Sequence, residues 1–243
     1  MELKKIFDSW AGTAKKDYAR KQWLLSKWEL FEGIEWTQEK KDLMVKSIAN
    51  GLQLRKTHAL LDLGCGGGWI LKQLKPRVKK IYGLDFSQRM LAFALKVCPG
   101  EKFISGEIST LPFKDGSFDR ALSYYVFLNF TDDRYVERSL MEILRVLKKG
   151  GRALIGQLPD KNRSRQYDLA KREHLAYCHE HFVLGKNIRD TFPPPLRLSD
   201  RVKLGRFLKD RKIKHRFLKS FNPFYRRGKP ALIDWRFDLV LGK

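Results

Sequence analysis

The sequence predicts a doubly wound α/β fold, in which a mostly parallel sheet carries helices on both faces. Two observations predict it. Short apolar runs alternate with helix-like segments from residue 59 to residue 157, a pattern typical of βαβ units. In addition, the apolar run at 59–63 breaks into four glycines within residues 64–68. Such a break is typical of a buried strand that passes into a helix whose N-terminus faces a ligand.

The elements follow from periodicity, caps and breakers. We expect strands at 59–63, 79–84, 102–104, 119–123, 152–157, 213–221 and 235–241. We expect helices at 18–31, 37–50, 68–75, 87–96, 132–147, 163–180 and 200–212, with Thr37 and Ser199 as caps of the second and the last. Because crossovers between parallel strands are right-handed, the carboxyl ends of the central strands should meet at one edge, where ligands bind.

The spacing of the glycines separates two classes of nucleotide site. Gly64, Gly66 and Gly68 form G-x-G-x-G, and Trp69 stands where a dinucleotide loop has its third glycine, which counts against a nicotinamide or flavin cofactor. Asp85 ends the next strand about twenty residues on and offers a carboxylate for ribose hydroxyls. Together they predict a nucleoside ligand.

Further signatures follow in order. F-I-S-G-E-I at residues 103–108 is followed by S-F-D at 117–119, and R-V-L-K-K-G-G occupies 145–151. With the glycine loop and Asp85, this series resembles the class I S-adenosylmethionine (SAM)-dependent methyltransferases. Two residues depart from the usual pattern: Glu107 replaces an aspartate, and Lys149 replaces a proline.

The resemblance implies a Rossmann-like, seven-stranded sheet with an antiparallel C-terminal edge hairpin. It also implies an N-terminal helical cap at 1–58, a SAM-binding core at 59–158, an inserted lid or substrate region at 159–198, and completion of the core by 199–243. In the implied site, the glycine loop and Asp62 face the amino-acid end of SAM, Asp85 holds the ribose, and Glu107 and Ile108 address adenine. The full set of expected cofactor residues is Asp62, Gly64, Gly66, Gly68, Asp85, Phe86, Glu107, Ile108 and Ser123.

The chain is strongly basic. Its 243 residues carry a formal charge of +23, and residues 159–243 contribute 22 lysines and arginines against 9 acids. Such a field attracts nucleic acid, an acidic glycan or an anionic membrane surface, although it is also compatible with a merely solvated surface. We expect no transmembrane segment, because no apolar run approaches about 20 residues. Three dispersed cysteines favour reduced thiols and a cytoplasmic protein.

Other candidate site residues are weaker. Tyr124 and Asn129 follow the fourth strand, where they either contact substrate or pack in a turn. C-H-E-H at 178–181 suggests a metal, but His179 and His181 diverge on a helix, and we expect no metal site. The spacing of His174, Cys178 and His181 suits one helix face, which is either a source of a general base or an ordinary amphipathic surface. Trp10, Trp23 and Trp28 either line a pocket or belong to a core.

The predicted function is methyl transfer from SAM, in line, to oxygen or nitrogen, less favourably to carbon. The predicted methyl acceptor is a small molecule, carbohydrate or lipid-linked compound, and the basic C-terminal third favours an anionic one. The alternative is an RNA methyltransferase that holds phosphates on that surface. A protein that binds SAM without turnover and a nicotinamide oxidoreductase are further alternatives. No catalytic residue and no oligomeric state follow from the sequence.

Overall fold

A seven-stranded mixed sheet forms the centre of the computed structural model, which describes residues 37–130, 132–165, 199–220 and 236–243. The strands lie in the order β3-β2-β1-β4-β5-β7-β6. The strands from β3 to β5 in this order are parallel to one another, whereas β7 runs antiparallel to both β5 and β6. The strands are β1 (Ala59–Leu63), β2 (Lys80–Asp85), β3 (Lys102–Ser105), β4 (Phe118–Tyr124), β5 (Leu147–Pro159), β6 (Lys214–Lys219) and β7 (Arg236–Gly242).

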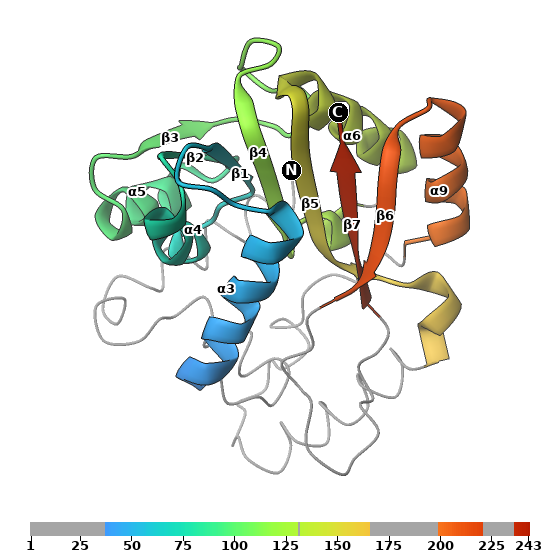
Figure 1. The fold of residues 1–243 in the computed structure, drawn as a ribbon, viewed down its shortest axis with the longest axis horizontal. Helices are drawn as coiled ribbons and strands as arrows, with labels where there is room; N and C mark the ends of the chain where they lie inside the picture. Colours follow the sequence, from blue (N-terminus) through green and yellow to red (C-terminus); the bar gives the residue numbers. More distant parts are fainter. Residues whose placement is uncertain (1–36, 131, 166–198, 221–235) are drawn as a thin grey trace, which may run out of the picture.

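Helices cover both faces of this sheet (Figure 1). The helices between residues 38 and 97 pack on one face, and those from residue 133 onward pack on the other. Each face therefore buries its own apolar cluster. The α-helices are α3 (Gln38–Leu52), α4 (Trp69–Leu74), α5 (Gln88–Val97), α6 (Asp133–Val146) and α9 (Arg201–Asp210). Short 3-10 turns are η2 (Lys75–Arg77), η3 (Phe127–Asn129) and η4 (Lys161–Arg163). The described part of the chain is therefore a doubly wound α/β domain, as the sequence predicts.

Side-chain caps fix the starts of α3 and α9. Thr37 accepts a hydrogen bond from the N–H of Lys40, as the sequence predicts for the cap of α3. Ser199, by contrast, is not the cap of α9. Asp200 takes that role and accepts from the N–H groups of Val202 and Lys203, because the Ser199 backbone is already bonded to the end of β5 through its N–H and the Pro159 carbonyl.

The remaining predicted elements lie where the sequence places them, with shifted ends. The strand predicted at 152–157 is longer, since β5 begins directly after α6 and continues to Pro159. The helix predicted to end at 212 ends at Asp210. The helices predicted at 18–31 and 163–180 lie wholly or mostly outside the described residues. Among the described helices, none is both long and apolar enough to cross a bilayer.

Two arginines join the C-terminal end of α3 to the sheet. Arg120 on β4 donates from Nε to the Leu52 carbonyl at 2.6 Å and is only 9% exposed. Arg152, its register partner on β5, donates from Nη1 to the Gly51 carbonyl at 3.4 Å. Cations are favourable beside the unpaired carbonyls of a helix C-terminus, so these contacts hold α3 over β4 and β5.

We predict that Arg120→Met lowers the free energy of unfolding by about 1–3 kcal/mol, because the buried Leu52 carbonyl loses a charged donor. Arg152→Met is the matched control and should lose less, because its hydrogen bond is longer and its side chain is less buried. Urea denaturation of both variants is the measurement. Equal losses would show that the two contacts are equivalent and contradict the prediction.

Candidate active site at the carboxyl edge of the sheet

The glycine turn between β1 and α4 is the centre of the candidate site. Gly64, Gly66 and Gly68 all have left-handed φ angles, of 75°, 51° and 79°, which glycine adopts without a steric penalty. The N–H groups of Gly64 and Cys65 both donate to the Leu84 carbonyl, at 2.7 and 3.1 Å. The turn is thereby fastened to the end of the neighbouring strand β2.

Asp85, the last residue of β2, completes this attachment. Its carboxylate accepts the Gly66 N–H on Oδ2 at 2.8 Å and the Ser87 N–H on Oδ1 at 2.9 Å. The side chain is 6% exposed. Asp85 thus shapes the turn, and its predicted contact with ribose stays a prediction.

Two of the glycines lie so close to other residues of the protein that a larger side chain would collide with them. A Cβ on Gly64 would lie 2.5 Å from a methyl group of Val126, and one on Gly68 would lie 3.2 Å from Ala94 on α5. The resemblance places these glycines against the amino-acid end of SAM. The structure gives them a packing role beside their backbone role, because the turn passes between β4 and α5.

A second buried acid lies beneath the turn. Asp62 on β1 is 3% exposed. Burial and then the charge of Asp85 raise the pKa of Asp62 to about 8, against which the Leu63 N–H acts only weakly. In the ligand-free protein Asp62 is therefore mostly protonated at neutral pH, and a cation bound at the glycine turn would favour its ionised form.

The other predicted cofactor residues lie at the same edge. Ile108 is buried and Phe86 is partly exposed. The hydroxyl of Ser123 donates to the Leu63 carbonyl at 3.0 Å and so joins β4 to β1. Glu107 accepts a 2.6 Å hydrogen bond from the hydroxyl of Tyr135 on α6, a residue that the sequence analysis missed.

Tyr135 is half-buried, and desolvation together with the hydrogen bond to Glu107 raises its pKa to about 12. It therefore serves as a neutral donor that orients the Glu107 carboxylate. No sequence signal identifies it, because it comes from a helix predicted only for its packing.

A set of buried polar side chains lies at the ends of β4, β5, β6 and β7, here named the strand-tip cluster. Its members are Tyr124, Gln157, Ser220, Arg236 and Asp238, and each is at most 8% exposed. Gln157 donates to the Tyr124 hydroxyl at 3.0 Å and accepts from Arg236 at 3.1 Å. Asp238 accepts from the Gln157 N–H at 2.8 Å and from the Ser220 hydroxyl. Of these residues, the sequence analysis named only Tyr124.

Asn129 is used locally. Its side-chain amide donates to the carbonyls of Tyr125 and Val126, at 3.3 and 3.1 Å, and so stabilises the turn η3. This contact favours the turn interpretation of Asn129.

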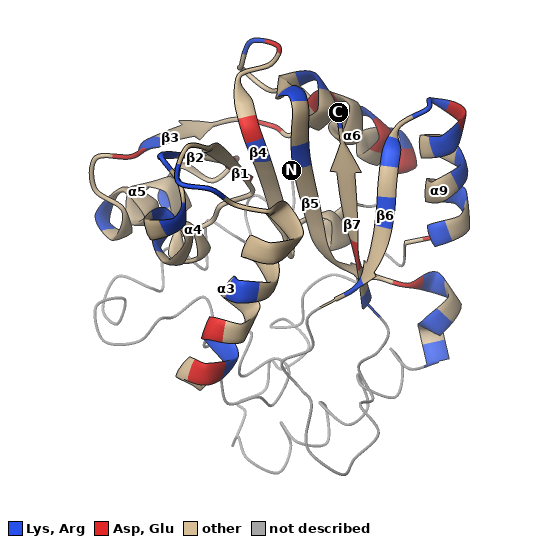
Figure 2. Cartoon of the chain, viewed as in Figure 1, with Lys and Arg blue, Asp and Glu red and all other residues tan. Residues whose placement is uncertain are grey.

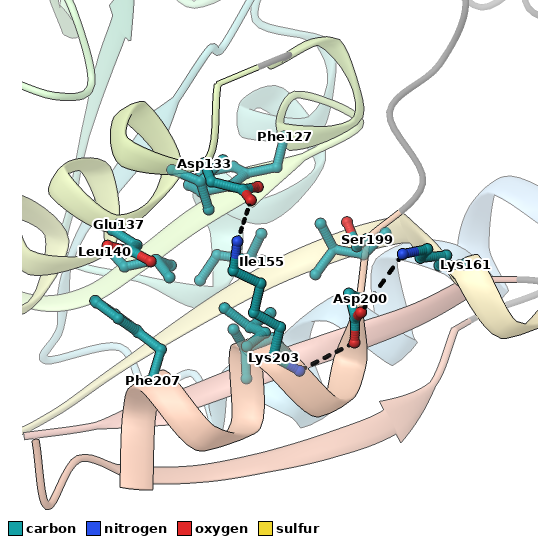
Figure 3. Close-up of a pocket in the computed structure, with 14 residues that line it drawn as sticks. Phe127, Asp133, Glu137, Leu140, Ile155, Lys161, Ser199, Asp200, Lys203 and Phe207 are labelled. Carbon is teal, nitrogen blue, oxygen red and sulfur yellow. Dashed lines mark hydrogen bonds and ion pairs between the residues drawn. The ribbon is translucent and has the colours of Figure 1, made fainter. Parts of the chain in front are cut away.

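A hollow of about 310 Å³ lies between α6 and α9, on the face of the sheet that these two helices cover (Figure 3). Its base is apolar, with Ile155, Leu158 and Leu239 beneath it. Lys203 on α9 crosses the opening to Asp133 on α6, with 2.5 Å between Nζ and Oδ2. None of the predicted cofactor residues lines it, so this hollow is separate from the glycine turn.

Several sequence predictions lie outside the described residues: the three N-terminal tryptophans, His174, and C-H-E-H at 178–181. Within the described ranges, no three His, Cys, Asp or Glu side chains are grouped as a metal site would require.

Part of this chain is similar to known methyltransferases. Residues 61–155 match the family model described as a methyltransferase domain. A demethylmenaquinone methyltransferase of Thermotoga maritima is 41% identical over 108 residues, which are 44% of this chain and 46% of that protein. A malonyl-[acyl-carrier protein] O-methyltransferase of Erwinia pyrifoliae is 33% identical over 42% of this chain and 37% of its own length.

Solved structures share the fold at low identity. An S-adenosylmethionine-dependent methyltransferase from Clostridium acetobutylicum aligns with a TM-score of 0.62 and 15% identity, covering 90% of this chain and 97% of that one. A putative methyltransferase from Haloferax volcanii, solved in complex with the Trm112 methyltransferase activator, aligns with a TM-score of 0.61 and 18% identity over 97% and 96%. The matched segment spans about half of the length of the curated relatives, or less.

We predict that Asp62 makes the stability of the ligand-free protein fall as pH rises from about 4 to about 8. A folded-state pKa near 8, above the ordinary value of 3.8, means that the folded protein binds the proton more tightly than the unfolded chain. The stabilisation is complete below the unfolded pKa and is lost as pH rises through the folded one. Asp62→Asn should remove this dependence, so the variant gains on the wild type between pH 5 and 9 in urea denaturation. Parallel pH profiles would contradict the assignment.

Proposed function

We propose that this chain transfers the methyl group of SAM to an oxygen or nitrogen atom of a small-molecule, carbohydrate or lipid-linked acceptor. In this proposal, residues 61–155 form a class I SAM-dependent methyltransferase domain. The observation that carries the proposal is the pair of buried carboxyl groups, Asp62 and Asp85, at the glycine turn. Together they form a largely water-free end of two adjacent strands, where a bound cation would favour the ionised form of Asp62.

The chemistry of SAM fits these residues. SAM has a positive sulfonium and a protonated amino group. Both are favourable beside the Asp85 carboxylate and beside an Asp62 that ionises when the cation binds. The Asp85 carboxylate, which also holds the turn, suits the ribose hydroxyls as a hydrogen-bond acceptor. Glu107, held by Tyr135, supplies a carboxylate for the adenine amino group. When bound, SAM supplies an electrophilic methyl group. The protein orients it, and most of the rate comes from positioning and from exclusion of water.

The names of relatives support the proposed class of methyl acceptor. Several curated relatives are named for demethylmenaquinone, for 2-phytyl-1,4-naphtoquinone or for the malonyl group of an acyl-carrier protein. None of these names is that of a nucleic acid. By extension, the acceptor of this chain is a small or carrier-linked organic molecule.

A basic surface on α9 and β6 favours a second candidate, an RNA methyltransferase. Lysines and arginines gather along both elements (Figure 2). The side chains of Arg206, Lys209, Arg211, Lys212 and Lys214 are all exposed. Their charge suits the phosphates of RNA, and such binding would fall steeply with salt.

The proposed function is tested with tritiated-methyl SAM and a lysate separated into RNA, glycan and lipid, and small-molecule pools. We expect label in the glycan and lipid pool or in the small-molecule pool. Asp85→Ala should lower SAM affinity by roughly 10- to 100-fold in calorimetry, because it removes charged hydrogen bonds from the turn and the ligand. No label in any pool would overturn the proposal, and label in RNA that falls with salt would replace it with the alternative.

Retention on heparin measures the basic surface directly. Reversal of Arg206, Lys209, Arg211, Lys212 and Lys214 to glutamate should abolish retention at moderate salt, because the surface changes from five positive to five negative charges. Reversal of Lys40, Lys41 and Lys46 on or beside the exposed side of α3 is the control and should leave most retention in place. Unchanged retention after the first reversal would mean that α9 and β6 form only a solvated face.

A further inference from the structure

The strand-tip cluster contains strained backbone beside its buried polar groups. Gln157 has a φ of 64° and Tyr125, which follows Tyr124, has a φ of 61°. Neither is glycine, and the left-handed region is costly for such residues. The register of β5 with β7 is irregular between Ile155 and Leu158, and this bulge places Gln157 in the cluster. Strain and bulges of this kind gather beside functional sites.

Asp238 is the acid of the cluster. Its neighbours on β7, Phe237 and Leu239, pack in the core on the α6 and α9 face, so the alternation of the strand directs Asp238 to the opposite face. Both of its hydrogen bonds, from the Gln157 N–H and the Ser220 hydroxyl, reach Oδ1. Within the described residues, none reaches Oδ2. Oδ1 of Asp238 is thus held in place by hydrogen bonds, and Oδ2 remains able to accept a hydrogen bond or a proton.

The cluster is continuous with the glycine turn. Ser123, beside Tyr124 on β4, bonds to the Leu63 carbonyl immediately before Gly64. On the other side, Tyr124 is bonded to Gln157, and the Gln157 N–H reaches Asp238. This path follows the carboxyl edge of the sheet from β1 through β4 and β5 to β7. A methyl acceptor placed beside the donor at that edge would meet the cluster.

We propose that Asp238 is the general base for the methyl acceptor, with Gln157 and Ser220 as the residues that position its carboxylate. This inference rests on the proposed function. In the step, the oxygen of an acceptor hydroxyl forms a bond to the methyl carbon while the bond from that carbon to the sulfonium sulfur breaks, and the sulfur keeps the electron pair. The hydroxyl proton passes to Oδ2 of Asp238, so charge and atoms balance.

The charged and titratable groups around Asp238 suit this role. Burial raises the pKa of Asp238 to about 6, while the Ser220 and Gln157 hydrogen bonds and the charge of Arg236 act in the opposite direction. Arg236, on the same strand, lies 5.5 Å from the centre of the Tyr125 ring. The pKa of the buried Tyr124 hydroxyl is raised well above its ordinary value, so this phenol stays neutral. A base with a pKa just below neutrality is efficient at physiological pH.

The test measures methyl transfer into the lysate pool that takes label from the wild type, as a function of pH. We expect an acidic limb near pH 6 in the wild type. Asp238→Asn, which keeps the shape and the two hydrogen bonds at Oδ1, should lose about 10²- to 10⁴-fold in rate together with that limb, while calorimetry gives SAM affinity within about twofold. Ser220→Ala should lower the rate by less than Asp238→Asn does, because Oδ1 loses one of its two positioning hydrogen bonds. It should also move the limb to higher pH, because a hydrogen bond to the ionised form is lost.

A measurement without turnover accompanies these variants. Carbon-13 NMR of the aspartate carboxyls in the free wild-type protein should show a resonance that titrates near pH 6 and is absent from Asp238→Asn. The inference is overturned if the wild type labels a pool and Asp238→Asn labels it at a similar rate with the same limb. It is also overturned if the limb does not move in Ser220→Ala. If the wild type labels no pool, the proposed function fails first, and this inference fails with it.

Discussion

The attachment of the glycine turn to β2 is the constraint on which the candidate site depends. The turn must leave the centre of a buried sheet and begin a helix within a few residues, so three of its residues adopt left-handed φ angles. That conformation is held by the Leu84 carbonyl and by Oδ2 of Asp85, while Oδ1 of the same carboxylate accepts from Ser87 at the start of α5. The order of β2 beside β1 is therefore a condition for the site, since a different neighbour would leave the turn without these partners.

A second constraint is the burial of acids at one edge of a basic protein. The chain carries +23 overall, yet Asp62, Asp85 and Asp238 lie buried at the carboxyl ends of strands or beside them. Burial disfavours the charged form of a carboxyl group. An ionised carboxylate at this edge therefore lowers the stability of the fold unless a bound cation, a hydrogen-bond donor or a transferred proton compensates its charge. The buried edge is thus rich in acids whereas the surface is rich in bases, and the surface charge by itself is a poor guide to the ligand.

The parts of the fold that the sequence predicts well are those in which local and tertiary preferences agree. β1 has the predicted bounds, and α3 and α5 begin at capping side chains, Thr37 and Ser87. Predictions failed where a tertiary contact competes with a local signal. Ser199 has the chemistry of a cap, but its backbone is bonded to the end of β5, and Asp200 caps α9 instead. The close approach of Val126 to Gly64 and of Ala94 to Gly68 also involves residues far apart in sequence, and it leaves the predicted cofactor role of these glycines a prediction.

The sequence by itself determined the alternation of strands and helices, the glycine turn, and the acid at the end of the second strand, because each depends on residues close together in the chain. Only the tertiary structure decided which distant side chains meet at that edge. Tyr135 reaches Glu107 across 28 positions, and the bulge in β5 brings Gln157 to Asp238 across 81. Such contacts arise from strand order, register and burial, which involve pairs of residues that no local pattern relates.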